Sequence, residues 1–327
     1  MANPKNTNFE AQLLEVLSRR MSGTAEGEVQ NTIVRLLALR ASLARLGARA
    51  DTELYRYFPL AAIAVLESDF RLTIAALVDS GEPYLSAGLK LSSDIIKSTS
   101  EIITLLQKKT VTVGDIVAHA LPFNSIASIE KSLNALLDGK IKQFVSEARD
   151  PWFTRPKLMD RDPLVQDVDK LWSDLAATFD HRHILAHEGA PDHGVSWEQA
   201  NTAIESVSLL TKALNAILWS TAWKDRPLTM PEMRDSAERD VRQAREKLSA
   251  HLKLARQHAL LRGGTLQLSR LHLAWKRNTI AWIHYETDGL MGGPRRVFST
   301  MSMASVLDQR IAQLENLLSI WPANSSD

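Results

Sequence analysis

The fold class is decided by the segment Leu60-Ala-Ala-Ile63-Ala-Val-Leu66-Glu67-Ser-Asp-Phe70-Arg71-Leu-Thr-Ile74-Ala-Ala-Leu77-Val78. Apolar side chains recur along it at the three- and four-residue spacing of an α-helix and form a wide apolar surface. Gly81 and Pro83 follow, a combination that commonly ends a helix. We therefore predict a long helix from about residue 51 to 78, with Glu67 and Arg71 as an acid–base pair four residues apart.

Helical periodicity also dominates outward from this segment, and no stretch alternates as a β-strand would. Before it, we predict a helix whose apolar face holds Ile33, Leu36, Leu37, Leu43 and Leu46. After it, we predict helices over 112–119, 125–137, 162–187 and 196–217, with an irregular stretch at 149–156. Further helices are expected over 231–260, through Trp275 and Trp282, and over 299–319. The sequence predicts an all-α protein.

Two prolines lie within five residues in the stretch from Trp223 to Pro231, between long periodic segments. This is the best candidate for a domain boundary. We expect a helical domain over residues 1–225 and a smaller helical domain over 226–327. Residues 1–224 carry 24 Lys and Arg against 27 Asp and Glu, whereas residues 225–327 carry 15 against 11. An asymmetry this mild is typical of an ordinary solvated surface.

Composition excludes several classes of function. The chain has no cysteine, so disulfides, thiolate catalysis and cysteine-based zinc sites are excluded. The first residues lack the apolar core of a signal peptide, and no apolar run approaches the ~18 residues of a membrane span. We therefore expect a cytoplasmic protein that does not associate with membranes.

The chemistry-bearing segment is Asp180-His181-Arg182-His183-Ile184-Leu185-Ala186-His187-Glu188, near the expected end of a helix. In a continuous α-helix, Asp180, His183 and His187 share one face, and Arg182 flanks it. An imidazole can take a proton from a 2′-hydroxyl or give one to a leaving oxygen. A guanidinium matches the geometry of a phosphate and stabilises its charged transition state. The segment therefore suits phosphodiester cleavage without a metal or other cofactor.

Arg182, four intervening residues and His187 resemble the Arg-x4–6-His signature of the HEPN superfamily. The segment Tyr55–Arg71 is similar to the first core helix of bacterial HEPN proteins. Gly114-Asp-Ile-Val-Ala-His119, which lies between that helix and the motif, also resembles these proteins. The resemblance covers roughly residues 50–222. It implies a helical bundle that forms a homodimer, with two motifs in one cleft.

Many HEPN proteins are metal-independent endoribonucleases of toxin or antiviral systems, so the resemblance implies RNA as the substrate. It makes Arg182 and His187 catalytic, with His183 assisting as the polar residue after the arginine. Glu67 and Arg71 would be supporting residues, and we place Asp180 and His119 in the same group. A catalytically silent domain that binds RNA or nucleotides, or that neutralises a toxin, is the alternative function.

Two other interpretations of the same residues remain open. The side chains could tie down the helix end by hydrogen bonds, with Arg182 pairing to Glu67 or Asp180. His183, His187 and Asp180 could also hold a metal ion, since two histidines four residues apart resemble helical zinc sites. The glutamate of the His-Glu-x-x-His pattern is missing between them, however. For His119, a hydrogen-bonded histidine at a helix end is the favoured interpretation.

The C-terminal part has a resemblance of its own. Leu266-Gln-Leu-Ser-Arg-Leu-His-Leu-Ala-Trp275-Lys-Arg-Asn, then Gly292-Gly293, then Arg310 to Leu318 resemble the LprI-type lysozyme-inhibitor-like family. Envelope members of that family use paired cysteines, which this sequence lacks, so an inhibitor role is in doubt. We expect Trp275, Trp282, Phe298 and Leu314 to lie in its core. The domain is interpreted as a binding or regulatory module for RNA, an antitoxin, a trigger protein or a second subunit.

Overall fold

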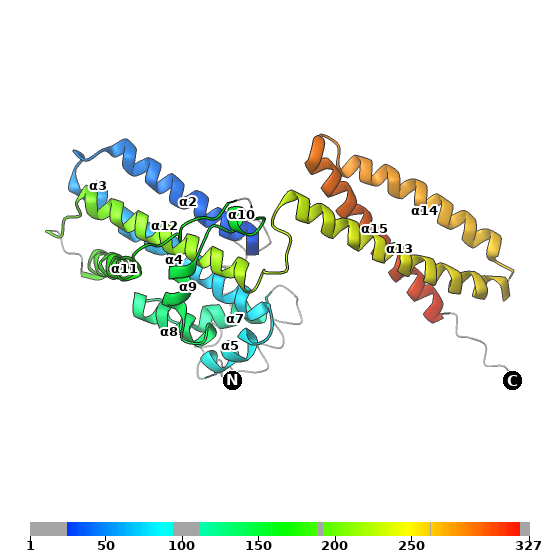
Figure 1. Ribbon diagram of the computed structural model, residues 1–327, viewed down its shortest axis with the longest axis horizontal. Coiled ribbons are helices and arrows are strands. Elements are labelled where there is room, and N and C mark those ends of the chain that lie inside the picture. Colours follow the sequence, from blue (N-terminus) through cyan, green and yellow to red (C-terminus); the bar gives the residue numbers. More distant parts are fainter. Residues whose placement is uncertain (1–24, 94–110, 158, 189–191, 262, 321–327) are drawn as a thin grey trace, which may run out of the picture. The chain divides into compact units, whose positions relative to one another are not determined.

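The computed structural model describes residues 25–93, 111–157, 159–188, 192–261 and 263–320; side chains 25–30, 187 and 188 lie outside this description. All regular elements within these ranges are helical, so the protein is all-α, as predicted (Figure 1). The chain divides into two compact units, Met1–Lys224 and Asp225–Asp327. No helix in the described ranges combines the length and apolar content that a membrane span requires.

Unit 1 is a bundle of long and short helices. Its elements are α2 (Ala25–Leu46), α3 (Thr52–Tyr55), α4 (Tyr57–Asp79), α5 (Tyr84–Ser92), α7 (Val113–Ala120), α8 (Ile126–Leu136), α9 (Ile141–Glu147), α10 (Pro151–Thr154), α11 (Val168–His183), the π-helical turn η1 (Ile184–Glu188) and α12 (Trp197–Ser220). The predicted helices at 112–119, 125–137 and 196–217 are confirmed as α7, α8 and α12. Each begins after a Thr or Ser whose side chain caps the helix within a capping box.

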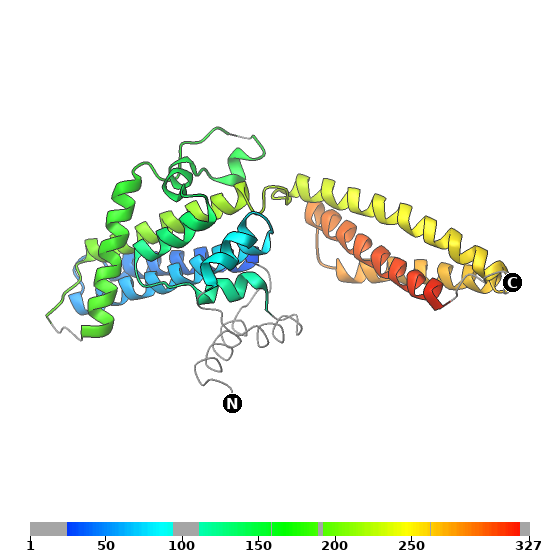
Figure 2. The same cartoon turned by 90° about the horizontal axis from the view of Figure 1, so that it is seen from below.

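Helix α4 lies at the centre of unit 1. Its side chains are buried on nearly every face, because α2, α5, α7, α11 and α12 all pack against it. Figures 1 and 2 show α2, α4 and α12 side by side. Helix α2 runs antiparallel to α4, to which a short connection joins it. Near the end of α2, Arg40 pairs with Glu205 of α12. Earlier in α2, Thr32 contacts Asp69, which Thr211, further along α12, also contacts. Helix α2 is therefore antiparallel to α12 as well. Helices α4 and α12 are therefore parallel.

The long helix predicted over 51–78 is divided at Arg56 into α3 and α4. Pro59 accounts for the division, because proline has no N–H for the carbonyl four residues earlier and its ring collides with that carbonyl. At the other end, α7 lies close to α4. A side chain at Gly114 would come within 2.8 Å of Asp79 Cγ and closer still to the Ala75 backbone. Glycine at this position allows the two helices to approach.

The apolar face predicted for the helix before residue 51 is partly wrong. The buried residues of α2 are Thr32, Leu36, Leu39 and Leu43, whereas Leu37 and Leu46 are exposed. The predicted face and the observed face both follow a helical period. Contact with α4 and α12 selects the face that begins at Thr32.

The start predicted for α11, at Asp162 and Pro163, is also wrong, because the helix begins at Val168. The Leu164 N–H donates to the Ala148 carbonyl at 2.8 Å, which holds this stretch out of helical geometry. Asp167 then caps the helix by accepting from the Lys170 N–H at 2.8 Å. Within the stretch expected to be irregular, residues 151–154 form the single turn α10.

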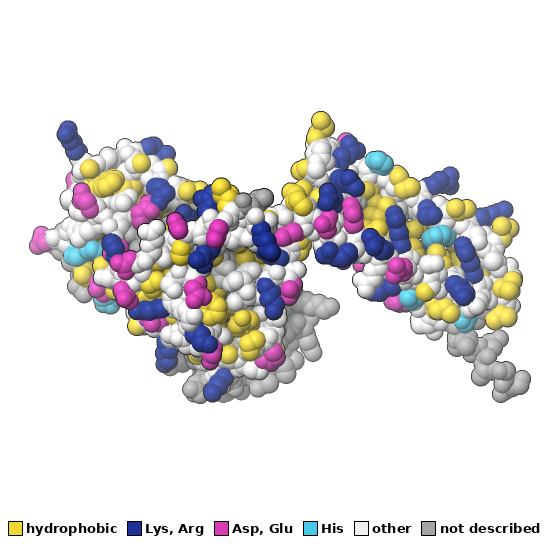
Figure 3. Space-filling view, in the orientation of Figure 1, with side chains coloured by type: hydrophobic (Ala, Val, Ile, Leu, Met, Phe, Trp, Pro, Cys, Tyr) yellow, Lys and Arg dark blue, Asp and Glu magenta, His cyan; other side chains and the backbone are white. Residues whose placement is uncertain are grey.

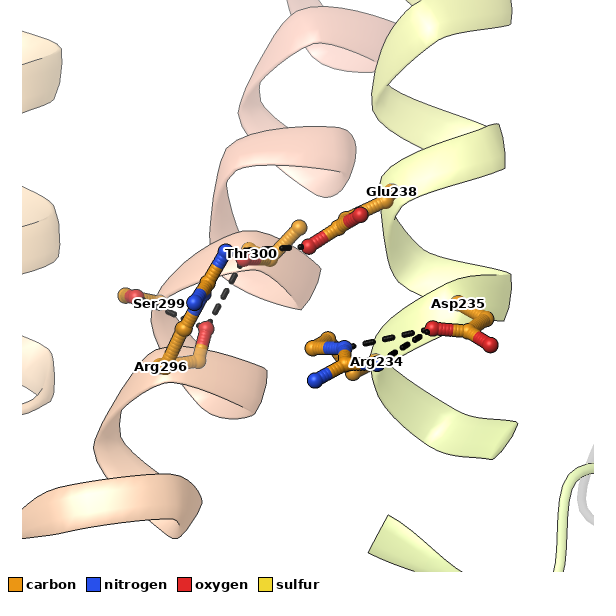
Figure 4. Close-up of polar contacts among 6 residues, drawn as sticks. All are labelled: Arg234, Asp235, Glu238, Arg296, Ser299 and Thr300. Atoms are coloured by element: carbon orange, nitrogen blue, oxygen red, sulfur yellow. Dashed lines mark hydrogen bonds and ion pairs between the residues drawn. The ribbon is translucent and has the colours of Figure 1, made fainter. Parts of the chain in front are cut away.

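Unit 2 consists of α13 (Met230–Leu261), α14 (Thr265–Glu286) and α15 (Gly292–Ile320). Glu238 of α13 accepts a hydrogen bond from Arg296 of α15 at 3.4 Å (Figure 4). Further along both helices, His251 lies 3.2 Å from Glu315, so α13 and α15 are parallel. Small residues of α13 allow close packing against α15, namely Ala244, Ala255 and Ala259, which share one core cluster with Leu307, Ile311 and Leu314. Helix α14 makes far less contact with either neighbour.

Three further predictions need correction. The last helix begins at residue 292 rather than 299; Pro294 fits its first turn, where backbone N–H groups lack helical partners. Trp282 and Phe298 are about half exposed, at 53% and 49%, instead of lying in the core. Trp223, expected in a hinge, is 2% exposed and belongs to the core of unit 1.

Candidate active site

The C-terminal end of α11 carries the predicted catalytic segment. Trp172 anchors the helix by donating from Nε1 to Glu130 of α8 at 2.8 Å. Phe179 anchors its last turns, because its ring lies 5.6 Å from that of Phe123, which in turn lies 5.3 Å from Phe70 of α4. The residues that follow Phe179 are therefore held at a fixed position beside α4.

Beyond Phe179 the segment turns towards solvent. Asp180 and His183 are exposed, and Arg182 is half-buried. The α-helix ends at His183, and residues 184–188 form the π-helical turn η1. The backbone of His187 lies in this turn, but its side chain lies outside the described residues. The structure thus places Arg182 and His183 together at a helix end, where unpaired carbonyls and the helix dipole favour cationic groups.

The face predicted for Asp180, His183 and His187 is only partly correct. A π-helical turn forms i→i+5 hydrogen bonds, so the ~100° per residue of an α-helix no longer applies after His183. Asp180 and His183 still share a face because both belong to α11. The angles predicted for His187 from the α-helical repeat, relative to Asp180 and to Arg182, do not hold.

A histidine pair beside the motif was not foreseen. His181 Nδ1 lies 3.0 Å from His193 Nε2, and both rings are half-buried. One ring must donate a proton and the other must accept it, so the contact requires at least one neutral imidazole. Burial lowers the pKa of His181, and the neighbouring His193 lowers it further, whereas Asp180 opposes the shift. The pair thus favours the unprotonated form of His181 near neutral pH.

Glu67 and Arg71 form a second polar group, on α4. Arg71 Nη2 lies 2.7 Å from Glu67 Oε1, and Arg71 Nη1 donates to the Ala118 carbonyl of α7 at 2.9 Å. Only 20% of the Arg71 side chain is exposed. His119, next to Ala118, is half-buried with its Nε2 inside the protein. The hydrogen bond from Arg71 attaches the end of α7 to α4.

The aromatic rings of Phe70, Phe123 and Phe179 connect α4 with α11. Phe70 directly precedes Arg71, Phe179 directly precedes Asp180, and Phe123 contacts both rings. The predicted supporting residues Glu67 and Arg71 lie on α4 and His119 lies on α7, whereas the motif lies at the end of α11, a helix that packs against α4. The Arg71 bond to the Ala118 carbonyl fixes the packing of α7 on α4, the helix against which α11 packs.

Within the described ranges, no group of three or more His, Asp or Glu side chains is placed to hold a metal ion. Searches against protein-family models, curated proteins and solved structures found no match to this chain.

Proposed function

We propose that unit 1 is a metal-independent endoribonuclease of the HEPN type that cleaves single-stranded RNA. The observation that carries the proposal is the position of the Arg182-x4-His187 motif. It spans the point where α11 changes into the π-helical turn η1, with Arg182 half-buried and His183 exposed. Single π-helical turns occur frequently at functional sites.

The reaction needs a base, an acid and a group that stabilises the phosphorane. In the proposed step His187 takes the proton from the 2′-hydroxyl, whose oxygen attacks the phosphorus. The bond from phosphorus to the 5′-oxygen breaks, and that oxygen receives a proton from a second imidazole, for which His183 is the candidate. Arg182 stabilises the charged oxygens of the phosphorane. The products are a 2′,3′-cyclic phosphate and a 5′-hydroxyl.

Two other features of unit 1 are consistent with this role. The pair of His181 and His193 keeps an unprotonated imidazole beside the motif, where positive charge would otherwise accumulate. The link from Arg71 to the Ala118 carbonyl holds α7 on α4, the helix against which α11 packs. Both features would keep the motif in a fixed geometry before substrate arrives.

The proposal includes a homodimer, because two copies of the motif in one cleft would supply two arginines and several imidazoles. A role in toxin or antiphage systems is part of the same proposal. Static light scattering of the full chain tests the assembly: a mass of twice 36.4 kDa is expected. A monomer that retains nuclease activity would refute the shared cleft.

The activity is tested with a fluorescently labelled single-stranded RNA in buffer containing EDTA. We expect cleavage, with cyclic or 3′-phosphate ends on the 5′ fragments. A matched oligonucleotide with 2′-deoxyribose at every position should remain intact, because it lacks the nucleophile. RNA that is cut only after Mg²⁺ or Mn²⁺ is added would exclude the proposed mechanism. Folded protein that binds RNA without cutting it would favour a silent binding domain.

A further inference from the structure

Unit 2 contains a groove of about 880 Å³ between α13 and α14, with α15 beneath it. Its lining residues on α13 run from Arg245 to Leu260, and those on α14 run from Thr265 to Ile280. Sixteen residues of α-helix extend about 22 Å at ~1.5 Å per residue, so the groove is as long as four turns of helix.

The groove is open because the three helices pack unequally. Helices α13 and α15 interlock through small residues, whereas α14 buries only Leu268, Thr279 and Ile283. Leu260 and Ile280, which line the groove, remain 71% and 54% exposed. Three helices with one open groove resemble a four-helix bundle that lacks a member.

The bottom of the groove is apolar and follows a helical period. Leu248 and Leu252 of α13 face Trp275 of α14, with Met303 and Leu307 of α15 below. Side chains at this spacing on two neighbouring helices are the usual receptor for the apolar stripe of an amphipathic helix. Figure 3 shows hydrophobic side chains lying among Lys and Arg side chains on one face of this unit.

The edges of the groove are basic. Arg245, Lys253, Arg256 and Lys276 line it, and none of its described lining residues is acidic. In the sequence, residues 247–285 hold seven Lys and Arg and no Asp or Glu. The positive charge also affects His272, which lines the groove. Burial lowers the pKa of its imidazole, and the nearby cations Arg310, Lys276 and Arg256 lower it further.

We propose that this groove binds an amphipathic helix of a partner protein, with an apolar stripe flanked by Asp and Glu. The occupant would complete the bundle, covering the exposed leucine and isoleucine side chains while its carboxylates pair with the basic edges. The proposal does not depend on the ribonuclease activity of unit 1.

Two other occupants fit the observations less well. A second copy of unit 2 would bring like charges together, because Lys and Arg outnumber Asp and Glu by seven to five in α13, three to one in α14 and three to two in α15. Single-stranded RNA binds on exposed aromatic faces. In this groove Trp275 already stacks with His272 at 5.4 Å, and Arg310 lies over its ring at 5.6 Å.

The test uses three fluorescently labelled 18-residue helical peptides and fluorescence anisotropy with the full chain. The first has a leucine stripe flanked by glutamates, the second has glutamine for every glutamate, and the third has serine for every leucine. We expect saturable binding of the first peptide and at least tenfold weaker binding of the other two. Binding should also weaken as salt is raised, because the flanking contacts are between exposed charges.

Variants of the protein locate the binding site. The double variant Lys253→Glu/Arg256→Glu and the double variant Leu260→Ser/Ile280→Ser should each weaken binding at least tenfold. All four side chains are exposed, so these variants should fold. Lys247→Glu is the matched control: Lys247 is an exposed cation of α13 that does not line the groove. It should change the affinity less than twofold.

Several results would overturn the proposal. They are absence of saturable binding of the acidic peptide, equal affinity for the glutamine peptide, and unchanged affinity in both double variants. A 12-nucleotide RNA whose binding falls in the charge variant but not in Leu260→Ser/Ile280→Ser would assign the groove to a polyanion. A dimer that dissociates in both double variants would assign it to a second copy of the chain.

Discussion

Asp69 provides the prediction that can be worked furthest from the structure. Its side chain is 1% exposed between α2, α4 and α12, and it accepts a hydrogen bond from Thr32 Oγ1 at 3.2 Å. Burial raises the pKa of its carboxyl to about 7, although the Thr211 and Thr32 hydroxyls oppose the rise. The carboxyl is therefore neutral in the folded protein up to nearly neutral pH, and it ionises near pH 4 in the unfolded chain.

The sign of the effect follows from proton binding. Between about pH 4 and pH 7 the folded state holds a proton that the unfolded state has lost, so the free energy of unfolding falls as the pH rises. A pKa that moves from 3.8 to about 7 corresponds to about 4 kcal/mol, at ~1.4 kcal/mol per unit. Asp69→Asn, which keeps the shape and cannot ionise, should remove this dependence.

The assay is urea unfolding of both proteins at pH 4 to 8, followed by tryptophan fluorescence. As the pH rises from 4 to 8, the unfolding free energy of Asp69→Asn should increase by about 4 kcal/mol relative to that of the unsubstituted chain. The denaturant slopes should agree, so that the comparison measures stability. A difference that stays constant from pH 4 to 8 would refute the account of this carboxyl.

Four further substitutions test the packing and the site. Gly114→Ala should lower the unfolding free energy by about 1–3 kcal/mol, since its methyl group overlaps the backbone of α4; an unchanged urea midpoint would contradict this. Arg71→Met should lower the unfolding free energy by about 1–2 kcal/mol, because it removes the hydrogen bond to α7. Glu67→Gln should lower it by only about 0.5 kcal/mol in the same urea titration. Because the pKa of His181 is lowered by folding, stability should fall as the pH drops below 6.5, and His181→Asn should flatten that fall; identical pH profiles would exclude the effect.

The sequence predicted elements best where local signals were unambiguous. Thr112, Ser125 and Ser196 each precede a helix with a partner three residues later, so local hydrogen bonds alone fix these starts. At α11 the sequence predicted a start at Asp162-Pro163, whereas the helix begins after Asp167. The hydrogen bond from the Leu164 N–H to the Ala148 carbonyl holds residues 162–166 out of the helix, and it joins residues that are not neighbours in the sequence.

In the candidate site, too, local features could be predicted from the sequence, whereas features set by the fold could not. Its placement at a helix end could be predicted, because Gly189 and Pro191 follow the motif in the sequence. The π-helical turn could not, since it depends on which backbone carbonyls the last turn uses. The pairing of His181 with His193 was also missed, because His193 lies beyond that glycine and proline and is brought back by the fold.

The central claim is that the segment at the end of α11 cleaves phosphodiesters, and the most direct test is the cleavage rate of single-stranded RNA by two variants in EDTA. Arg182→Ala and His187→Ala should each lower the rate about 10²–10³-fold, the usual cost of losing one interaction made in the transition state. Lys170→Ala, an exposed position at the other end of the same helix, should leave the rate unchanged. Circular dichroism must show that all variants remain folded. Folded Arg182→Ala and His187→Ala proteins with rates within threefold of the unsubstituted chain would contradict the account.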